Sequence, residues 1–466
     1  MSTRQDGEPS PPISSHDELV AWFSVGCKPA GEWRIGTEHE KIGFRTDDLR
    51  PVPYDGARGI RALMEQLMDR YGWLPINEGD NIIALRRPDG EPMATVSLEP
   101  GGQFELSGAP LETMHDVAAE TRTHLDQVRA IGEDLKVNFL GLGFSPSWTL
   151  AETPKMPKRR YGVMTRYMPQ VGSRGLDMMY RTATIQVNLD FASEADMVRK
   201  LRVSLALQPL ATAIFAASPF TEGKPNGYLS MRSEVWRDTD RNRTGLLPFV
   251  FEGGMSFDRY VEYALDVPMY FIYRDGQYID VAGASFRDYL GGRLAEKLDR
   301  PELKSLVATI DDWSDHLTTI FPEVRMKRFL EMRGADAGLA GAINALPAFW
   351  VGLLYDQSSL DAAWDLVKGW SAEERDTLRG DVPKAALHAR FRKHTLHDIA
   401  REVMAMSAEG LKARKRLDAK GADERIHLDY AQQIVESGRT AAEAMLEAYE
   451  TSWGRNINNV YKDVAF

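Results

Sequence analysis

The sequence has little cysteine and no long apolar run. Cys27 is the only cysteine among 466 residues, so an intrachain disulfide and a zinc site built from several thiolates are excluded. No apolar segment approaches the roughly 18 residues that a membrane helix needs, and no membrane partner is expected. A chain so poor in cysteine fits a reducing compartment, and we expect the protein to be cytoplasmic.

The chain also lacks a positive net charge and a P-loop. Its formal charge is −11, which disfavours nucleic acid as a partner and requires that an anionic substrate meet a local cluster of basic residues. No Gly-x-x-x-x-Gly-Lys-Ser/Thr motif occurs, so we expect nucleotide binding to depend on metal ions and a sheet. Residues 1–14 are polar and rich in proline. They predict a disordered tail before a single domain at 15–466.

The spacing of apolar residues predicts an α+β fold. Helical periodicity is present at about 15–26, 57–71, 111–136, 194–217 and almost throughout 336–452. Strand patterns are present at about 34–44, 73–107, 182–191, 269–283 and 324–333, and irregular loops are expected at 145–178 and 218–256. Strands thus concentrate at about 30–285 and helices at about 300–460. We expect antiparallel strands with polar faces that pack against helices.

Two glutamates lie two residues apart in the first predicted strand. Glu38 and Glu40 share one face of that strand with Ile42 and Phe44, which argues against full exposure. Two neighbouring carboxylates repel each other unless a cation or water screens them. An all-oxygen site of this kind favours Mg²⁺ or Mn²⁺. His39, between them, points to the other face and is expected to be a structural, core-facing residue.

Similar polar faces recur along the chain. Glu99 and Glu105 are an even number of residues apart, although Gly101 and Gly102 leave their register uncertain. Glu331 and Arg333 share a face, a pairing that suits a metal and phosphate site. Gln186 and Asn188 add neutral amide oxygens on the face opposite the apolar residues of 182–191. The segment 228–245 forms a predicted anion pocket through Arg232, Arg237, Arg241 and Arg243, with Trp236 as a flat wall.

Each pattern has an ordinary explanation when it is taken alone. A Glu-x-Glu pair is most often a solvated strand face, and a Glu-x-Arg pair is often a surface ion pair of little energetic value. Gln186 and Asn188 are also typical of an exposed sheet face. The functional interpretation depends on several such faces meeting on one sheet.

Five segments of the chain form an ordered set of motifs. They are Gly-Thr-Glu-His-Glu-Lys-Ile-Gly-Phe (36–44), Gly-Leu-Asp-Met-Met (175–179), Thr-Ala-Thr-Ile-Gln-Val-Asn-Leu-Asp-Phe (182–191), Ser-Pro-Phe-Thr-Glu-Gly-Lys-Pro-Asn-Gly (218–227) and Arg-Thr-Gly-Leu-Leu-Pro-Phe-Val-Phe (243–251). Together they resemble the plant and proteobacterial type of glutamate–cysteine ligase, also called γ-glutamylcysteine synthetase. The resemblance covers roughly 30–460. It implies a glutamine-synthetase-like fold, in which a curved antiparallel sheet forms a funnel walled by helices, with a largely helical C-terminal part.

The resemblance also implies the reacting molecules and their ligands. They are ATP, L-glutamate and L-cysteine, with two or three Mg²⁺ or Mn²⁺ ions. The implied metal ligands are Glu38, Glu40, Glu99, Glu105 and Glu331, with Gln186 at a position where related ligases place a histidine. Glu331 and Arg333 are the implied catalytic pair, Arg333 binding the phosphoryl group. The implied glutamate pocket contains Arg232, Trp236, Tyr270 and Arg160.

The expected reaction is the first step of glutathione biosynthesis. The γ-carboxylate of glutamate attacks the γ-phosphoryl group of ATP, and the amine of cysteine then displaces phosphate from γ-glutamyl phosphate. A related carboxylate–amine ligase with another amine acceptor, or a catalytically inactive protein that binds glutamate or nucleotide, are the alternatives. We expect a monomer or a weak homodimer.

Overall fold

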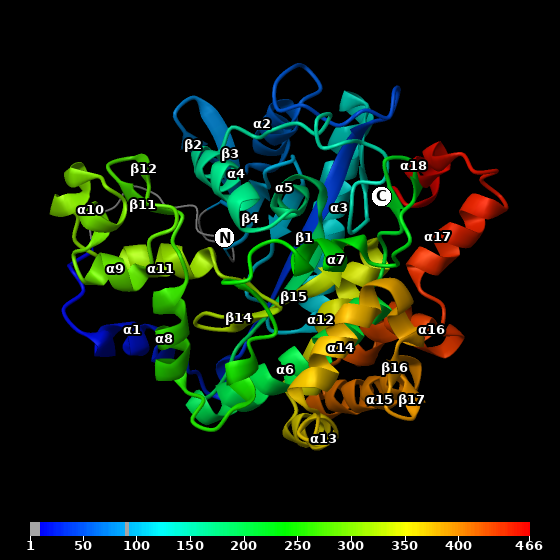
Figure 1. Ribbon diagram of the computed structural model, residues 1–466. Coiled ribbons are helices and arrows are strands. Elements are labelled where there is room, and N and C mark those ends of the chain that lie inside the picture. The colour runs from blue at the N-terminus through cyan, green and yellow to red at the C-terminus, as the bar shows by residue number, and fades with distance from the viewer. Residues whose placement is uncertain (1–9, 89–92) are drawn as a thin grey trace.

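The computed structural model describes residues 10–88 and 93–466 (Figure 1). Most of the predicted disordered tail, residues 1–9, lies outside the described residues. The rest of that segment is ordered, because Pro12 forms a bridge with Thr309 and the Ile13 amide donates to the Ala308 carbonyl over 2.9 Å. The ordered chain therefore begins before the first predicted helix.

One antiparallel sheet forms the centre of the molecule. In the described ranges it has nine strands in the order β14-β15-β7-β1-β5-β4-β3-β2, and β6 pairs with the far end of β1. All of these pairings are antiparallel. The strands are β1 (Ile35–Arg45), β2 (Leu74–Glu78), β3 (Asn81–Arg86), β4 (Thr95–Leu98), β5 (Phe104–Ser107), β6 (Val137–Leu140), β7 (Thr184–Leu189), β14 (Val324–Met326) and β15 (Leu330–Asp336).

Helices cover one face of the sheet, and on the central strand β7 this face is apolar. On β7, Ile185, Val187 and Leu189 are buried in the main core, as their alternation with polar residues predicts. The helices against this face are α3 (Met114–Leu135), α6 (Glu194–Ile214) and α12 (Ala340–Leu354), which contact β1, β15 and β7. Helix α2 (Ile60–Tyr71) packs beside α3 on a second core cluster. The polar side of the strands is left facing away from these helices.

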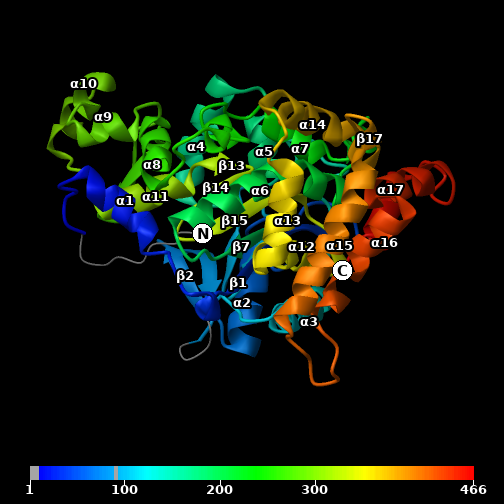
Figure 2. The same cartoon turned by 90° about the horizontal axis from the view of Figure 1, so that it is seen from below.

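The C-terminal part is helical, as predicted. Figure 2 shows these helices gathered together in yellow to red. They are α13 (Gln357–Val367), α14 (Ala372–Ala385), α15 (Leu396–Arg414), α16 (Asp429–Ser437), α17 (Ala441–Glu450) and α18 (Val460–Asp463), interrupted by the hairpin of β16 (Arg390–Phe391) and β17 (His394–Thr395). Among the described residues, no helix combines the length and the apolar character that a bilayer crossing requires.

A second group of helices lies at the other end of the molecule (Figure 2). It comprises α1 (His16–Ser24), α8 (Phe257–Asp266), α9 (Phe286–Leu290), α10 (Leu294–Lys297) and α11 (Ile310–Thr318), with the hairpin of β11 (Phe271–Arg274) and β12 (Gln277–Asp280). The remaining short strands are β8 (Phe220–Thr221), β9 (Lys224–Pro225), β10 (Thr244–Gly245) and β13 (Phe321–Pro322). Short 3-10 helices lie at Ala30–Glu32, Pro248–Phe251, Pro301–Ser305, Ala386–His388, Glu424–Leu428 and Ile457–Asn459.

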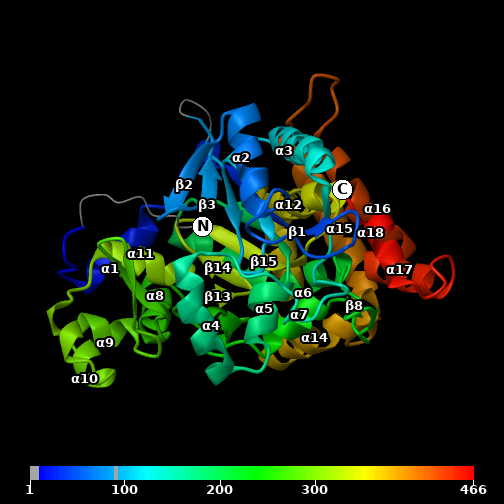
Figure 3. The ribbon, with the colours of Figure 1, turned by 90° about the horizontal axis from the view of Figure 1, so that it is seen from above.

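Two segments predicted as loops contain helices. The segment 145–178 includes α4 (Arg159–Val171) and the start of α5 (Gly175–Arg181), which lie across the sheet from α3 and α12 (Figure 3). Tyr161, Met164 and Met168 give α4 a buried stripe at helical spacing, which the preceding basic residues and the internal Pro169 obscured. Within 218–256, α7 (Met231–Arg237) begins at its capping residue Ser230.

The strand predicted at 324–333 is a hairpin. β14 and β15 pair with each other, and the Lys327 amide donates to the Phe329 carbonyl over 2.8 Å at the turn. The continuous alternation of the sequence hid this turn, because no glycine or proline marks it.

Candidate active site

The register of the sheet places the predicted acidic residues on one polar face. Glu38 on β1 lies opposite Gln186 on β7, and Glu40 lies opposite Glu105 on β5. Asn188 donates through Nδ2 to Glu38 Oε1 over 3.0 Å. Because alternate residues of a strand point to opposite faces, these groups all lie away from the helix-covered side.

All of these side chains except Asn188 line one cavity, which we call the acidic cavity. Its lining residues are Glu38, Glu40, Glu99, Glu105, Arg160, Gln186, Thr318, Phe321, Arg325 and Arg333. The sheet supplies the acidic side, whereas α4 and the chain from the end of α11 through β14 and β15 supply the basic side. The structure therefore brings together seven of the predicted residues in one site, where carboxylates face guanidinium groups.

The carboxylates on the β1 and β5 side lie close to one another, with Glu105 buried and Glu40 half-buried. Burial and the nearby charges of Glu38 and Glu99 together raise the pKa of Glu105 to about 8. Burial likewise raises the pKa of Glu40 well above its ordinary value, with Glu99 and Glu105 adding to the effect. Hydrogen bonds from the Thr184 amide to Glu40, 3.0 Å, and from Ser107 to Glu105, 2.9 Å, orient the two groups without neutralising them. Added positive charge would stabilise this side.

Glu331 is in the opposite situation. It is fully buried, its Oε2 lies 2.5 Å from Arg325 Nε, and its Oε1 lies 3.0 Å from Arg333 Nη1. Burial acts to raise its pKa, but the charges of Arg325, Lys327 and Arg333 outweigh burial and hold the pKa well below the ordinary value. Glu331 is not among the lining residues of the acidic cavity, and its predicted role as a metal ligand stays a prediction. In this structure its oxygens hold the two arginines.

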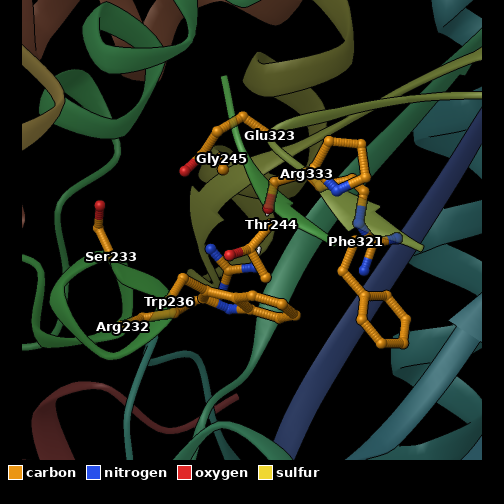
Figure 4. A pocket seen from close by; sticks show the side chains of 10 residues that line it. Arg232, Ser233, Trp236, Thr244, Gly245, Phe321, Glu323 and Arg333 are labelled. Carbon is orange, nitrogen blue, oxygen red and sulfur yellow. Dashed lines mark hydrogen bonds between the residues drawn. The ribbon is translucent and has the colours of Figure 1, made fainter. Parts of the chain in front are cut away.

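Arg333 separates the acidic cavity from a second, adjoining one. Its Nη1 donates to Gln186 Oε1 as well as to Glu331. The second cavity, which we call the α7 cleft, shares Arg333 and Phe321 with the acidic cavity. Its lining residues, shown in Figure 4, are Arg232, Ser233, Trp236, Thr244, Gly245, Phe321, Pro322, Glu323, Arg333 and Gly334. The two cavities thus meet at one guanidinium group.

Two donors in the α7 cleft are buried without a protein partner. Arg232 Nε and Trp236 Nε1 have no hydrogen-bond partner in the structure, and buried donors of this kind usually find one. Arg232 is otherwise anchored, since its Nη2 donates to the Arg333 carbonyl over 2.8 Å. On another wall of the cleft, Glu323 is paired with Arg379 over 2.9 Å. An anion that accepts from Arg232 and Trp236 would satisfy both free donors.

Three predicted pocket residues do not reach either cavity. Arg243 is fully buried in the core, where it pairs with Asp240 over 2.6 Å and its guanidinium carbon lies 4.0 Å from the ring centroid of Tyr270. The Tyr270 hydroxyl lies 3.7 Å from Met168 Sδ, also in the core. Arg241 is exposed on a separate groove. The four arginines of the segment 228–245 therefore do not form one pocket. Only Arg232 lines the α7 cleft.

The sequence interpretation missed Arg325, Glu323, Thr318 and Phe321. Arg325 lies opposite Glu331 across the β14–β15 hairpin, so recognition of the turn at 327–329 would have found it. Glu323 and Phe321 come from a stretch with no motif, and only the pairing of β13 with β10 brings them to the cleft. The prediction that His39 faces the core is confirmed, because it is buried and packs 5.6 Å from the ring of His124.

The donor chemistry of the acidic cavity fits a hard divalent cation. Four carboxylates and one amide oxygen converge there, and Mg²⁺ and Mn²⁺ prefer such oxygen ligands. Within residues 10–88 and 93–466, no three acidic, histidine or cysteine side chains are arranged so that, as they stand, they could hold one metal ion. Burial, together with repulsion between the carboxylates, raises the pKa values of Glu40 and Glu105, and a bound cation would favour the ionised form of both groups.

Comparison with known proteins identifies the family. The model of glutamate–cysteine ligase family 2 matches residues 34–463. The chain belongs to this family. Glutamate–cysteine ligase B, chloroplastic, of Oryza sativa subsp. japonica is 52% identical over 455 residues, which cover 98% of this chain and 88% of the rice protein. The chloroplastic enzyme of Arabidopsis thaliana is 50% identical over 452 residues, which cover 97% of this chain and 83% of the plant protein.

A solved structure supports the fold. Glutamate–cysteine ligase of Francisella tularensis, in complex with AMP, superposes with a TM-score of 0.53 at 12% identity, covering 93% of this chain and 88% of that one. The predicted α+β ligase fold and the predicted glutamate–cysteine ligase activity are both confirmed.

The expected cytoplasmic location is contradicted by the same relatives. The rice, Nicotiana tabacum and Arabidopsis thaliana proteins are all named as chloroplastic. The expectation came from the single cysteine, and scarcity of cysteine fits any reducing compartment without distinguishing between them.

Proposed function

We propose that the acidic cavity binds the ATP phosphates together with divalent cations, and that the α7 cleft binds L-glutamate. The observation that carries this proposal is the shared wall at Arg333, which borders both cavities. A glutamate held in the cleft would have its γ-carboxylate next to the phosphoryl group that it attacks. ATP is the co-substrate of this ligase family, and the Francisella tularensis relative in the fold comparison was solved with AMP.

Glu38, Glu40, Glu99, Glu105 and Gln186 are the residues that would hold the cations. They line the cavity, whereas Glu331 is occupied by Arg325 and Arg333. Bound Mg²⁺ would supply neutralisation of phosphate charge. The raised pKa values of Glu40 and Glu105 support this assignment, since a cation would offset the repulsion between these carboxylates.

The α7 cleft suits a zwitterionic amino acid. Arg232 Nε and the Trp236 indole N–H are free to donate to the α-carboxylate, and a carboxylate accepts from a guanidinium strongly. Glu323 on another wall is the acceptor available for the α-ammonium group, in addition to its bond with Arg379. Recognition at both charged groups leaves the γ-carboxylate directed toward Arg333.

The reaction then requires positioning and charge neutralisation. A γ-carboxylate oxygen forms a bond to the γ-phosphorus as the bond to the ADP oxygen breaks, and Arg333 stabilises the charge that spreads over the phosphoryl oxygens. Arg325 and Glu331 fix Arg333 in place. The cysteine amine next forms the amide bond while the carbon–oxygen bond to phosphate breaks, and phosphate leaves. Arg160, on α4, adds positive charge at the cavity wall.

The test is an assay of purified protein with ATP, Mg²⁺ and L-glutamate, with and without L-cysteine. Cysteine should stimulate ADP release and yield γ-glutamylcysteine in equal amount. Arg333→Lys, which keeps the charge but loses the forked geometry, should lower kcat by about 100-fold or more. A normal kcat in this variant would remove Arg333 from the phosphoryl site. A screen of other amines in the same assay would reveal a different acceptor.

The cleft assignment is tested separately with Arg232→Ala. The KM for glutamate should rise by about tenfold or more, because a charge-assisted hydrogen bond to the α-carboxylate is lost. The KM for ATP should change little. An unchanged KM for glutamate would place the amino acid elsewhere.

A further inference from the structure

The N-terminus of α7 is tied to the strand that carries Arg333 by a buried aspartate. Asp336 is the last residue of β15 and is 1% exposed. Its Oδ2 accepts from the Ala217 amide, 2.8 Å, and from Ser218 Oγ, 2.7 Å. Its Oδ1 accepts from Ser230 Oγ over 2.8 Å. Asp336 itself does not line the α7 cleft.

Ser218 and Ser230, which both donate to Asp336, also accept hydrogen bonds from the first turn of α7. Ser230 Oγ caps the helix by accepting from the Ser233 amide over 3.2 Å, and Ser218 Oγ accepts from the Arg232 amide over 3.2 Å. A hydroxyl has one proton, and an ionised carboxylate can only accept. Asp336 therefore accepts the one hydrogen bond that each serine hydroxyl can donate, and the serine oxygens remain free to accept from the helix amides.

The charge of Asp336 also reaches Arg232. Burial lowers the pKa of Arg232, and the negative charge of Asp336 is the main opposing influence. The backbone leaves room for the carboxylate at Gly143, where an added Cβ would lie 2.3 Å from Asp336 Cγ. A carboxylate in this closed space is thus the group that both orders the helix start and balances the buried guanidinium.

We propose that Asp336 is the positioning residue that holds Arg232, and with it the glutamate-binding end of α7, in register with Arg333. Two observations connect α7 with β15. Arg333 and Asp336 are three residues apart on β15. Arg232 on α7 donates through Nη2 to the Arg333 carbonyl over 2.8 Å. The inference rests on the proposed role of the α7 cleft as the glutamate site. It adds a residue that acts through Ser218 and Ser230 without touching the substrate.

The test is steady-state kinetics on Asp336→Asn, purified and shown by thermal melting to be folded. An asparagine amide donates where the carboxylate accepted, so one serine must turn its proton toward the helix. The KM for glutamate should rise by about tenfold, the KM for ATP should stay within about twofold, and kcat should fall less than the KM for glutamate rises. A KM for glutamate within twofold of that of the native protein would overturn the proposal.

A second variant, Ser230→Ala, tests the proposal even if Asp336→Asn does not fold. Ser230→Ala keeps the charge of Asp336 but removes the link to the Ser233 amide, and it should raise the KM for glutamate severalfold. The matched control is Ser256→Ala, which removes the equivalent cap of α8, where Ser256 Oγ accepts from the Arg259 amide over 3.1 Å. It should lower the melting temperature to a similar extent and leave the KM for glutamate unchanged. Equal KM values in the two serine variants would show a merely structural role.

The variant Arg232→Ala separates failure of this inference from failure of the proposed function. If Arg232→Ala raises the KM for glutamate and neither Asp336→Asn nor Ser230→Ala does, the cleft is the glutamate site and Asp336 does not position it. If Arg232→Ala also leaves the KM unchanged, the cleft assignment itself is wrong, and the inference is overturned with it.

Discussion

The two sides of the acidic cavity place glutamate in opposite electrostatic settings. On the β1 and β5 side, the half-buried Glu40 and the buried Glu105 lie near other carboxylates, and their pKa values are raised. On the β14 and β15 side, Glu331 is as buried as Glu105 but contacts Arg325 and Arg333, and its pKa is lowered. The difference teaches that burial alone does not decide the state of a carboxylate, since the neighbouring charges determine the outcome. A cation would stabilise the carboxylates on the β1 and β5 side, whereas Glu331 already has Arg325 and Arg333 as counter-ions.

Substitution of Glu331, the carboxylate paired with two arginines, should have the largest effect on stability and activity. Glu331→Gln leaves Arg325 and Arg333 buried without their counter-charge, so the free energy of unfolding should fall by roughly 3–5 kcal/mol. Activity should fall by orders of magnitude at the same time, because Arg333 loses its anchor. Chemical denaturation and the ADP assay measure the two effects. If Glu331→Gln is as stable as the native protein, the pairing of Glu331 with Arg325 and Arg333 does not distinguish it from Glu40 and Glu105.

The pH dependence of stability should come next in size. The pKa of Glu105 is raised to about 8 in the folded protein, so between its ordinary value of about 4.5 and about 8 the folded state binds more protons than the unfolded state. This contribution to stability is fully present below about pH 4.5 and is lost as the pH rises through about 8. In metal-free protein the loss should be on the order of a few kcal/mol.

Divalent cations should abolish the loss of stability that Glu105 causes as the pH rises, because bound Mg²⁺ stabilises the ionised carboxylates. The measurement is the free energy of unfolding across pH 5–9, in EDTA and in excess Mg²⁺. The same slope with and without Mg²⁺ would place the ion away from Glu105.

Removal of the uncompensated carboxylate should act in the opposite direction to Glu331→Gln. Glu105→Gln relieves the repulsion from Glu38 and Glu99, so the metal-free protein should become more stable by about 1 kcal/mol at pH 8. The Mg²⁺ concentration needed for half-maximal activity should rise by at least about tenfold, since even indirect support of a metal ligand contributes that much. Glu331→Gln is the matched control. Loss of stability in both variants would contradict the comparison.

The smallest effect is expected at Arg241. It is exposed and lines neither cavity, so Arg241→Ala should change the free energy of unfolding by no more than about 0.5 kcal/mol. The KM for glutamate should stay within about twofold. A large rise in this KM would restore the whole arginine-rich segment as a substrate pocket.

Much of the fold could be predicted from local patterns. The alternation of Ile185, Val187 and Leu189 predicts a half-buried strand because strand periodicity depends on neighbouring residues alone. The helical periodicities after residue 336 do likewise. The helices at Arg159–Val171 and Met231–Arg237 were missed because charge and proline obscure the first and only a serine cap marks the second.

The sequence by itself determined the polar faces: it placed Glu38 with Glu40 and Glu331 with Arg333, since residues two apart on a strand must share a side. It could not determine which of these carboxylates would be neutralised. That was decided by the tertiary structure, where a hairpin sets Arg325 against Glu331 and the pairing of β1 with β5 sets Glu40 against Glu105. The physical reason is that the energy of a buried charge depends on neighbours distant in the chain, and only folding brings them within reach.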